Sequence, residues 1–347
     1  MGLPELRAGQ GADNGGHMGA RIIFPQKSVV CLDAFDPRPP GEGEVTVRTR
    51  YSLMSIGTET TILHQKYDPE SHFAAMFSFP QMQTGVQAIG TVESVGTDVK
   101  EFVPGDLVFM RKAHASHWTL AASDCSRVPA NIDAKSACWC GLAKTAFRAA
   151  HAAPFSLGGQ VLIIGAGPVG QMAVRWATAA GMQQIVVVDL SEYRLKLARL
   201  GGATDTFAGT LDRVRQDVLN CGAAAPFEIV VEATGNAAVF APLLGLAGMF
   251  GKVVVLGDTG YPGKQCLTSD LMTRGLTVVA THDHHDRGGW TQRRIDALFF
   301  ELATTRRFPL EGLITHEFKP AACVDAYRLA SETRDQALGV LFDWSGE

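Results

Sequence analysis

Three absences narrow the function of this 347-residue chain. It has no apolar run near the roughly 18 residues that a membrane-spanning helix needs, so we expect no membrane association. It also lacks clusters of lysine and arginine, and its net charge of −4 argues against a nucleic-acid-binding surface. Its seven cysteines are scattered, without the pattern of a disulfide framework, which favours a reducing cytoplasm.

Hydrophobic patterning divides the chain into two kinds of structure. From residue 20 to about residue 129, short alternating or β-branched runs are bounded by Gly, Pro or Asp, which predicts a compact, barrel-like β unit. From residue 156, apolar runs alternate with helix-like segments, which predicts βαβ units and a parallel sheet; these runs are 161–164, 185–188, 229–231 and 253–256. Residues 314–344 return to a strand–helix–strand pattern and are expected to rejoin the first unit.

The segment VLIIGAGPVG, which ends at Gly170, is typical of a buried strand that breaks into a glycine-rich turn and a helix. Gly165 permits the tight turn, Gly167 lets backbone N–H groups approach a pyrophosphate, and Gly170 lets the helix pack closely on the strand. The phosphates would lie at the helix N-terminus, beside Pro168 and Val169, where the helix dipole favours negative charge. The motif therefore predicts a dinucleotide site.

Asp189 ends the next apolar run and indicates which dinucleotide is bound. An acidic side chain at this place accepts hydrogen bonds from the adenosine ribose diol and repels a 2′-phosphate. No arginine or lysine follows it before Arg194. The sequence therefore predicts NAD in preference to NADP.

Together with further motifs, these residues resemble the medium-chain dehydrogenase/reductase superfamily of alcohol dehydrogenase-like enzymes. The matching motifs are SIGTE at 55–59, FVPGDLV at 102–108, TA at 145–146, EATG at 232–235 and VLG at 255–257. The resemblance implies an α/β fold with a GroES-like β domain and a Rossmann domain, whose sheet is parallel and doubly wound. It also implies an active site in the cleft between the two domains.

The resemblance sets the expected boundaries. We predict a GroES-like catalytic domain over residues 18–147 and 315–347, and a Rossmann NAD-binding domain over residues 148–314. Residues 1–17 are Gly-rich and polar without an apolar signal core, so we predict a disordered tail. Members of the superfamily are usually dimers or tetramers, and the edge strand that would join two copies is expected at residues 276–280.

The resemblance also assigns contacts around the nicotinamide. Thr145 should touch the nicotinamide side. Ala233, Thr234 and Gly257 should flank the nicotinamide ribose from the ends of successive strands. Ligands of parallel sheets lie outside the carboxyl ends of the strands, which agrees with this placement.

The departures from the family concern zinc. Zinc-dependent members carry a Cys where this chain has Ile56 and a His where it has Val86, and neither replacement has a lone pair for a metal. Cys140 lies near the expected third ligand but is one residue out of register when Thr145 is aligned. The four-cysteine lobe for structural zinc is absent as well, so we predict no metal. Gln87 replaces a Glu, which suits the loss of a cation or is an ordinary buried amide.

Without a metal, side chains must handle the substrate's proton. Thr58 matches the family's Ser/Thr that hydrogen-bonds the substrate oxygen; the alternative is a strand-end hydroxyl satisfied by backbone. Glu59 replaces the usual Asp and is either a general base or an ion-pair partner behind the site. Lys144 is either an oxyanion-stabilising cation or a solvated charge at a helix start.

The run THDHHD at residues 281–286 is the most unusual local feature. An imidazole titrates near neutral pH and suits proton transfer, and His282 is the best candidate. The alternatives are a polar surface loop and a metal site.

We therefore predict a zinc-independent, NAD-dependent dehydrogenase that acts on a secondary alcohol such as a sugar, cyclitol or polyol, or on the matching ketone. One alternative is an enoyl- or quinone-type C=C reductase. Another is a protein that keeps NAD tightly bound for transient oxidation during an elimination or epimerisation. The expected partner is a small-molecule substrate.

Overall fold

The computed structural model describes residues 7–8, 18–77, 79–221 and 226–346. Apart from the short strand β1 (Arg7–Ala8), the tail predicted at 1–17 lies outside these residues. Two compact units divide the chain: one spans Met1–Lys66, His72–Gly141 and Ile314–Glu347, and the other spans Tyr67–Ser71 and Leu142–Leu313. None of the helices in the described ranges is long and apolar enough to cross a bilayer.

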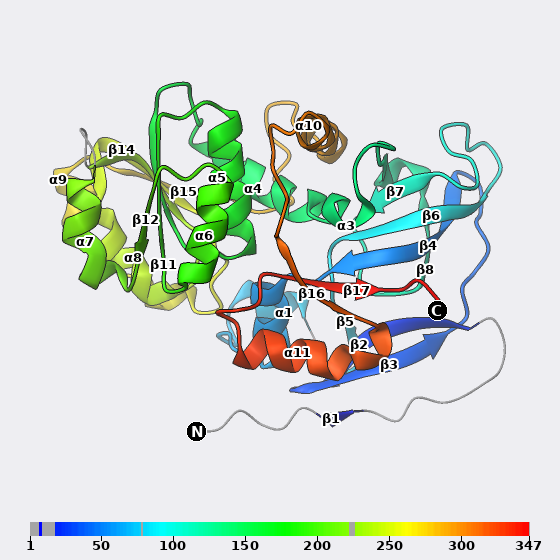
Figure 1. Ribbon diagram of the computed structural model, residues 1–347. Coiled ribbons are helices and arrows are strands. Elements are labelled where there is room, and N and C mark those ends of the chain that lie inside the picture. The colour runs from blue at the N-terminus through cyan, green and yellow to red at the C-terminus, as the bar shows by residue number, and fades with distance from the viewer. Residues whose placement is uncertain (1–6, 9–17, 78, 222–225, 347) are drawn as a thin grey trace. The chain divides into compact units, whose positions relative to one another are not determined.

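The first unit is built from two sheets, whose strands are mostly antiparallel (Figure 1). One sheet, as far as the chain is described, has the order β1, β3 (Val29–Phe35), β2 (Gly19–Gln26), β5 (Met82–Gln83). The other runs β16 (Ile314–Phe318), β17 (Gly339–Asp343), β4 (Glu44–Leu53), β6 (Ala88–Val95), β7 (Leu107–Met110), β9 (Cys125–Arg127), with β8 (His117–Ala121) paired to β4. The alternation of apolar and polar residues in the sequence arises because one face of a strand packs on the core. In β4, for example, Val45 and Val47 face a buried core while Arg48 is exposed.

Short helices complete the first unit. They are α1 (Ile56–Leu63), α2 (His72–Met76), α3 (Ala134–Ala137) and α11 (Cys323–Glu332), with 3-10 turns η1 (Ala122–Asp124) and η3 (Pro320–Ala322). Helix α11 packs against α1 and β3. The C-terminal segment therefore belongs to the first unit, because β17 pairs with β4.

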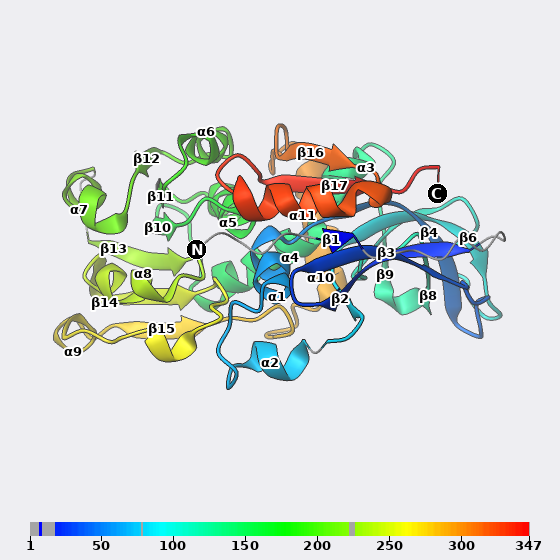
Figure 2. The same cartoon turned by 90° about the horizontal axis from the view of Figure 1, so that it is seen from below.

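The second unit contains a wholly parallel sheet, which has six strands over the described residues (Figure 2). Its order is β12 (Asp205–Ala208), β11 (Gln184–Asp189), β10 (Gln160–Ile164), β13 (Phe227–Glu232), β14 (Ala247–Val255), β15 (Thr277–Ala280). The predicted α/β fold is confirmed, and the strand predicted at 276–280 forms one edge of this sheet. The order reverses between β10 and β13, which is where doubly wound sheets bind ligands.

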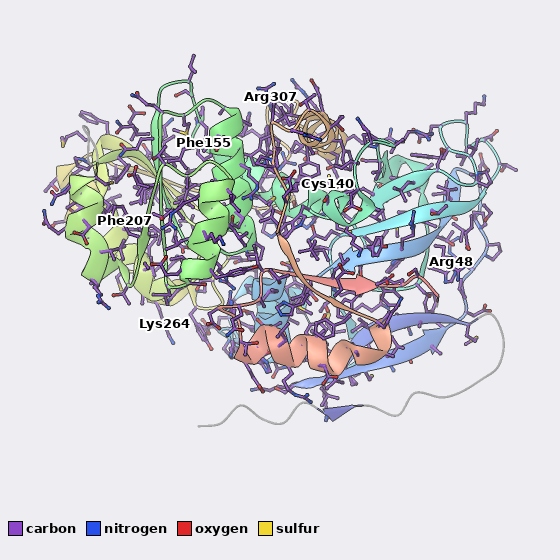
Figure 3. The ribbon with its side chains drawn as sticks, viewed as in Figure 1. Arg48, Cys140, Phe155, Phe207, Lys264 and Arg307 are labelled. Carbon is purple, nitrogen blue, oxygen red and sulfur yellow. The ribbon has the colours of Figure 1, made fainter. Side chains whose placement is uncertain are left out.

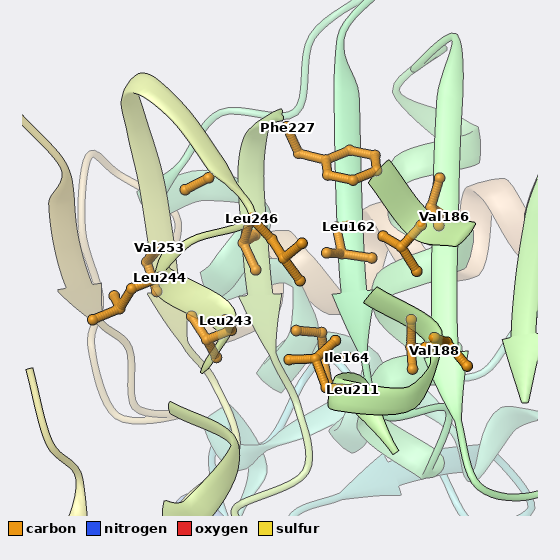
Figure 4. Packing of buried hydrophobic residues seen from close by; sticks show 14 of the residues in the cluster. Leu162, Ile164, Val186, Val188, Leu211, Phe227, Leu243, Leu244, Leu246 and Val253 are labelled. Carbon is orange, nitrogen blue, oxygen red and sulfur yellow. The ribbon is translucent and has the colours of Figure 1, made fainter. Parts of the chain in front are cut away.

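Helices cover the sheet in two pairs: α5 (Pro168–Ala179) lies beside α6 (Glu192–Leu200), and α7 (Leu211–Asn220) beside α8 (Ala237–Leu244) (Figures 1 and 2). Figure 4 shows Leu162, Ile164, Val186 and Val188 on the face that packs against Leu243 of α8. The central residues of strands β10, β11 and β13 are apolar and buried because helices cover both faces. The unit also contains α9 (Asp270–Thr273), α10 (Gln292–Thr304) and η2 (Pro262–Lys264). Helix α4 (Cys140–Ala152) belongs to it from Leu142 onward, while the first two residues of α4 belong to the first unit.

The glycine-rich turn between β10 and α5 has the close contacts that its sequence predicts. Gly165 has φ +100°, which favours glycine, and a Cβ there would lie 2.8 Å from the methyl group of Thr234. A Cβ on Gly170 would lie 1.8 Å from the carbonyl oxygen of Gly165. A Cβ on Gly167, by contrast, meets only the Arg194 guanidinium, at 3.8 Å.

This difference yields a test with a matched pair of variants. We expect Gly170→Ala to lower the free energy of unfolding by about 3 kcal/mol, because a backbone atom blocks the new methyl group. Gly167→Ala should leave that free energy nearly unchanged but weaken NADH binding at least about tenfold, because the methyl group fills the space where a phosphate would approach. Urea unfolding and NADH fluorescence titration measure the two effects. Equal effects of the two variants on both quantities would contradict this account.

Candidate functional site

The residues predicted to bind the dinucleotide meet at the carboxyl ends of the parallel strands. Gly165 follows β10, Asp189 ends β11, and Gly257 follows β14. The backbone N–H of Ala233 donates to Ile164 O at 2.8 Å, so the ends of β13 and β10 are joined directly. Within the second unit, the structure thus brings together the turns after β10, β13 and β14 and the carboxylate of Asp189, all of which the sequence assigned to the cofactor.

The Asp189 side chain is held by the glycine-rich turn at which the dinucleotide is predicted to bind. Its Oδ2 accepts a hydrogen bond from Ala166 N–H at 2.7 Å, and its Oδ1 accepts one from Ser191 N–H at 2.8 Å. Each carboxylate oxygen accepts more than one hydrogen bond. The side chain therefore has fixed orientation and remaining capacity for a ribose diol.

Arg194 is a residue whose place the sequence reasoning missed. It lies on α6, which begins after the N-cap Ser191, and its residue is 8% exposed. Its guanidinium approaches Gly167, as described above. The sequence feature that could have identified Arg194 is its position in the first turn of the helix that follows Asp189. A cation beside this turn suits a phosphate or ribose oxygen of either dinucleotide.

The N-terminus of α5 fits a pyrophosphate. Gly167 is the N-cap and supplies no side-chain cap, while Pro168 occupies the first turn, where a missing N–H costs nothing. The first N–H groups of a helix, among them those of Val169 and Gly170, have no partner within the helix. An NAD(P) pyrophosphate placed there would accept hydrogen bonds and face the positive end of the helix dipole.

Glu232, the last residue of β13, was not singled out as a functional residue. Its carboxylate is fully buried and accepts hydrogen bonds from Thr234 N–H at 2.6 Å, from the Thr234 hydroxyl, and from Gly235 N–H at 3.2 Å. Burial raises the pKa of Glu232 to about 7, although these hydrogen bonds oppose the rise. The turn that carries Ala233 and Thr234 is therefore organised by a carboxyl group that titrates near neutral pH.

The raised pKa of Glu232 predicts a pH-dependent stability. The ordinary value is 4.5 and the folded value about 7, so the stabilisation is complete below pH 4.5 and is lost as the pH rises through 7. We expect the unfolding free energy of the wild type, relative to Glu232→Gln, to fall by about 3 kcal/mol across this interval. Urea unfolding at several pH values measures it. Glu228→Gln, an exposed position on the same strand, is the control, and a parallel course for wild type and Glu232→Gln would refute the claim.

Lys144 and Thr145, on α4, contact one carboxylate. The Thr145 hydroxyl donates to Asp283 Oδ1 at 3.2 Å, and Lys144 Nζ lies 3.3 Å from the same atom. Lys144 is 4% exposed and also donates to Gln292 Oε1. The alternative of a solvated charge at a helix start is therefore wrong, and Lys144 anchors the segment after β15.

His282 lies in that segment and is half-buried. Its Nδ1 accepts a long hydrogen bond, 3.4 Å, from His284 N–H, so the neutral ring carries its proton on Nε2. Burial and the neighbouring His284 lower the pKa of His282. Asp286 pairs with the buried Arg148, so the segment is fastened to α4 and is not simply a solvated loop.

In the first unit, Glu59 on α1 is at the centre of a buried polar cluster. Its Oε1 accepts from Ser55 N–H at 2.6 Å, and its Oε2 contacts Nε2 of His114 at 3.1 Å and accepts from the Tyr327 hydroxyl. Nδ1 of His114 meets the Ser52 hydroxyl at 2.7 Å. Burial acts to raise the pKa of Glu59, but His114 and these hydrogen bonds hold it below its ordinary value. This geometry favours the ion-pair interpretation over a general base.

Thr58 and His64 flank this cluster on or beside α1. The Thr58 hydroxyl is half-buried and accepts from the Ser55 hydroxyl at 3.4 Å, so it lies on a helix and not at a strand end. His64 is packed between the hydroxyls of Ser28 and Ser331, each at 2.9 Å, which makes it part of the core.

The positions of the family's zinc ligands do not fit a metal in this chain. Ile56 is buried and apolar, and Val86 is half-buried. Cys140, which is labelled in Figure 3, is the first residue of α4 and is fully buried. Among the described residues, no group of three or more His, Cys, Asp or Glu side chains is arranged to hold a metal ion.

Comparison with known proteins agrees with the two-unit architecture. A model of the alcohol dehydrogenase GroES-like domain matches residues 41–167, and a model of the zinc-binding dehydrogenase domain matches residues 168–290. An L-threonine 3-dehydrogenase of Anaeromyxobacter sp. (strain Fw109-5) is 27% identical over an alignment of 307 residues, which covers 78% of this chain and 86% of that relative.

Two solved structures illustrate the fold. An alcohol dehydrogenase of Escherichia coli CFT073 complexed with NADH has a TM-score of 0.80 at 15% identity, covering 94% of this chain and all (100%) of that one. A dehydrogenase of Sinorhizobium meliloti 1021 bound to NADP has a TM-score of 0.77 at 18% identity, covering 94% of this chain and 100% of that one. At these identities the likeness concerns the fold alone.

The glycine-rich turn, the parallel sheet and the matching domain models define an NAD(P)-dependent dehydrogenase. The order of the two matched domains identifies the family of dehydrogenases to which the chain belongs. The chain belongs to the medium-chain dehydrogenase/reductase family, with an alcohol dehydrogenase GroES-like domain followed by a zinc-binding dehydrogenase domain.

Proposed function

We propose that this protein is a zinc-independent oxidoreductase that oxidises a secondary alcohol of the sugar, cyclitol or polyol type, or reduces the matching ketone, with NAD. The observation that carries the proposal is the apolar pair Ile56 and Val86 at the positions of two zinc ligands, of which Ile56 is only 1% exposed. Hydrocarbon side chains offer no electron pair to a metal. The name of the L-threonine 3-dehydrogenase relative supports a hydroxylated substrate.

Bound NAD would supply the hydride chemistry, and the chain's own side chains must place the substrate and manage its proton. We assign to Thr58 the hydrogen bond to the substrate oxygen and the passage of its proton toward solvent. His282 offers its Nε2–H as a donor to an oxygen, because Nδ1 is engaged by His284 N–H. Glu59 fixes the start of α1, and Lys144 fixes Asp283, so both act as positioning residues.

The cofactor preference rests on Asp189, whose anchored carboxylate suits a ribose diol and repels a 2′-phosphate. Arg194 beside Gly167 suits a phosphate or ribose oxygen of either dinucleotide, so it does not decide between NAD and NADP. The same carboxylate speaks against the enoyl- or quinone-reductase alternative, whose members usually prefer NADPH. Transient oxidation by tightly bound NAD would use the same contacts.

We also propose a cytoplasmic homodimer or homotetramer that forms through β15. Residues Thr277 and Val278 of this edge strand are exposed, and Phe250 and Met272 are exposed apolar side chains. Phe250 N–H donates to Arg274 O at 2.7 Å, which connects the bend of β14 to the segment leading into β15. An exposed, apolar strand edge readily pairs with another strand.

The seven cysteines are all free, which supports a reducing compartment.

The function is tested by screening secondary alcohols and polyols for NADH formation with protein treated with a chelator. We expect turnover without stoichiometric zinc in metal analysis, and at least about a tenfold preference for NAD over NADP. Thr58→Ala should lower kcat more than NADH affinity, with Thr61→Ala on the same helix as control. One zinc per chain, with activity lost on its removal, would defeat the proposal.

The dimer is tested at Val278. Val278→Lys places a charge on the strand edge and should shift sedimentation of the protein toward the monomer. Leu157→Lys, at another exposed apolar position of the second unit, is the control and should leave the assembly unchanged. An unaltered sedimentation coefficient for Val278→Lys would exclude this edge as the interface.

A further inference from the structure

We propose that Arg111 binds the substrate oxygen on which negative charge develops. Its guanidinium would supply there the positive charge that zinc supplies in zinc-dependent dehydrogenases. The inference rests on the proposed zinc-independent function and deepens it. Arg111 directly follows β7 and is half-buried.

The geometry places the guanidinium at the former metal-ligand segments. Arg111 Nη1 lies 3.5 Å from Gly141 O, to which it donates. A Cβ on Gly141 would lie 3.3 Å from the same nitrogen and 2.6 Å from Gln87 Oε1. The cation and the amide oxygen therefore converge on the residue next to Cys140, beside the segment that carries Val86.

Hydrogen bonds tie this place to the end of β4, which leads directly into α1. Leu53, at the end of β4, donates its N–H to Gln87 O at 3.2 Å and accepts from Gln87 Nε2 at 3.4 Å. His114 N–H donates to Thr84 O at 2.9 Å. The segments that carry Thr58, Gln87 and Arg111 are thus held together within the first unit.

The chemistry suits a guanidinium in this role. Oxidation of a secondary alcohol breaks its C–H and O–H bonds and forms C=O; the hydride goes to NAD, and the proton goes through Thr58 to water. Negative charge grows on the oxygen during the step, and fixed N–H donors stabilise it. A guanidinium carries five N–H donors and no acceptor, so the role of Arg111 is to donate hydrogen bonds to the charged oxygen.

The neighbouring Lys112 provides a matched control. Its ammonium lies 5.6 Å from the centroid of the Trp118 ring. Arg111→Ala, Arg111→Lys and Lys112→Ala therefore separate a charge at this place from a charge nearby. Circular dichroism and NADH fluorescence titration establish that each variant is folded and binds the cofactor.

We expect Arg111→Ala to lower kcat/KM about 100-fold or more, with NADH affinity changed less than about twofold. Arg111→Lys should retain an intermediate value, and Lys112→Ala should resemble the wild type. About 10 mM guanidinium chloride should restore the activity of Arg111→Ala at least tenfold and leave Lys112→Ala unaffected. Activity of Arg111→Ala within threefold of the wild type would overturn the assignment, as would a loss that guanidinium does not restore.

A second measurement does not depend on turnover. Isobutyrate, a small carboxylate of similar shape to a secondary alkoxide, is titrated calorimetrically into each protein saturated with NADH. Binding at least tenfold weaker in Arg111→Ala than in wild type and Lys112→Ala supports Arg111 as the oxyanion ligand, even if no alcohol is oxidised and the proposed function fails. Equal affinity in Arg111→Ala and wild type overturns the inference, even if the wild type oxidises alcohols.

Discussion

The contact between Gly170 and the carbonyl oxygen of Gly165 is the constraint on which the cofactor end of the second unit depends. It brings the first turn of α5 against the end of β10, which no side chain at residue 170 would permit. The backbone N–H groups of α5 and the carboxylate of Asp189 are thereby aimed at one place, since Asp189 binds Ala166 within the same turn. The order of the parallel strands supplies the rest, because the ends of β10 and β13 lie side by side.

A different constraint organises the first unit. The start of α1 is held by Glu59, which reaches back to Ser55 N–H and is itself held by His114 and Tyr327. A buried carboxylate is stable only when its hydrogen-bonding capacity is filled. Here Thr84 and Ser52 extend the cluster, through Tyr327 and His114 respectively. The helix that carries Thr58 is therefore held in place by this cluster of side chains.

Much of the fold was predictable because its signals are local. The difference between short alternating runs and apolar runs separated by helix-like segments distinguishes the β unit from the parallel sheet. The spacing of Gly165 and Gly170 predicts their close contact. The Glu59 cluster was not predictable, since Tyr327 is 268 residues away in the chain and nothing near it in sequence marks the pairing. The burial of Lys144 was missed for the same reason, because its partner Asp283 comes from a distant segment.

Two buried glutamates show why burial alone does not decide a protonation state. Glu59 and Glu232 are both nearly inaccessible, yet the pKa of Glu59 is lowered and that of Glu232 is raised to about 7. Glu59 faces a histidine as well as neutral donors, whereas the hydrogen bonds to Glu232 come from Thr234 and Gly235, which carry no charge. A change in activity near neutral pH therefore points to Glu232 before Glu59, whose ionised form persists through that range.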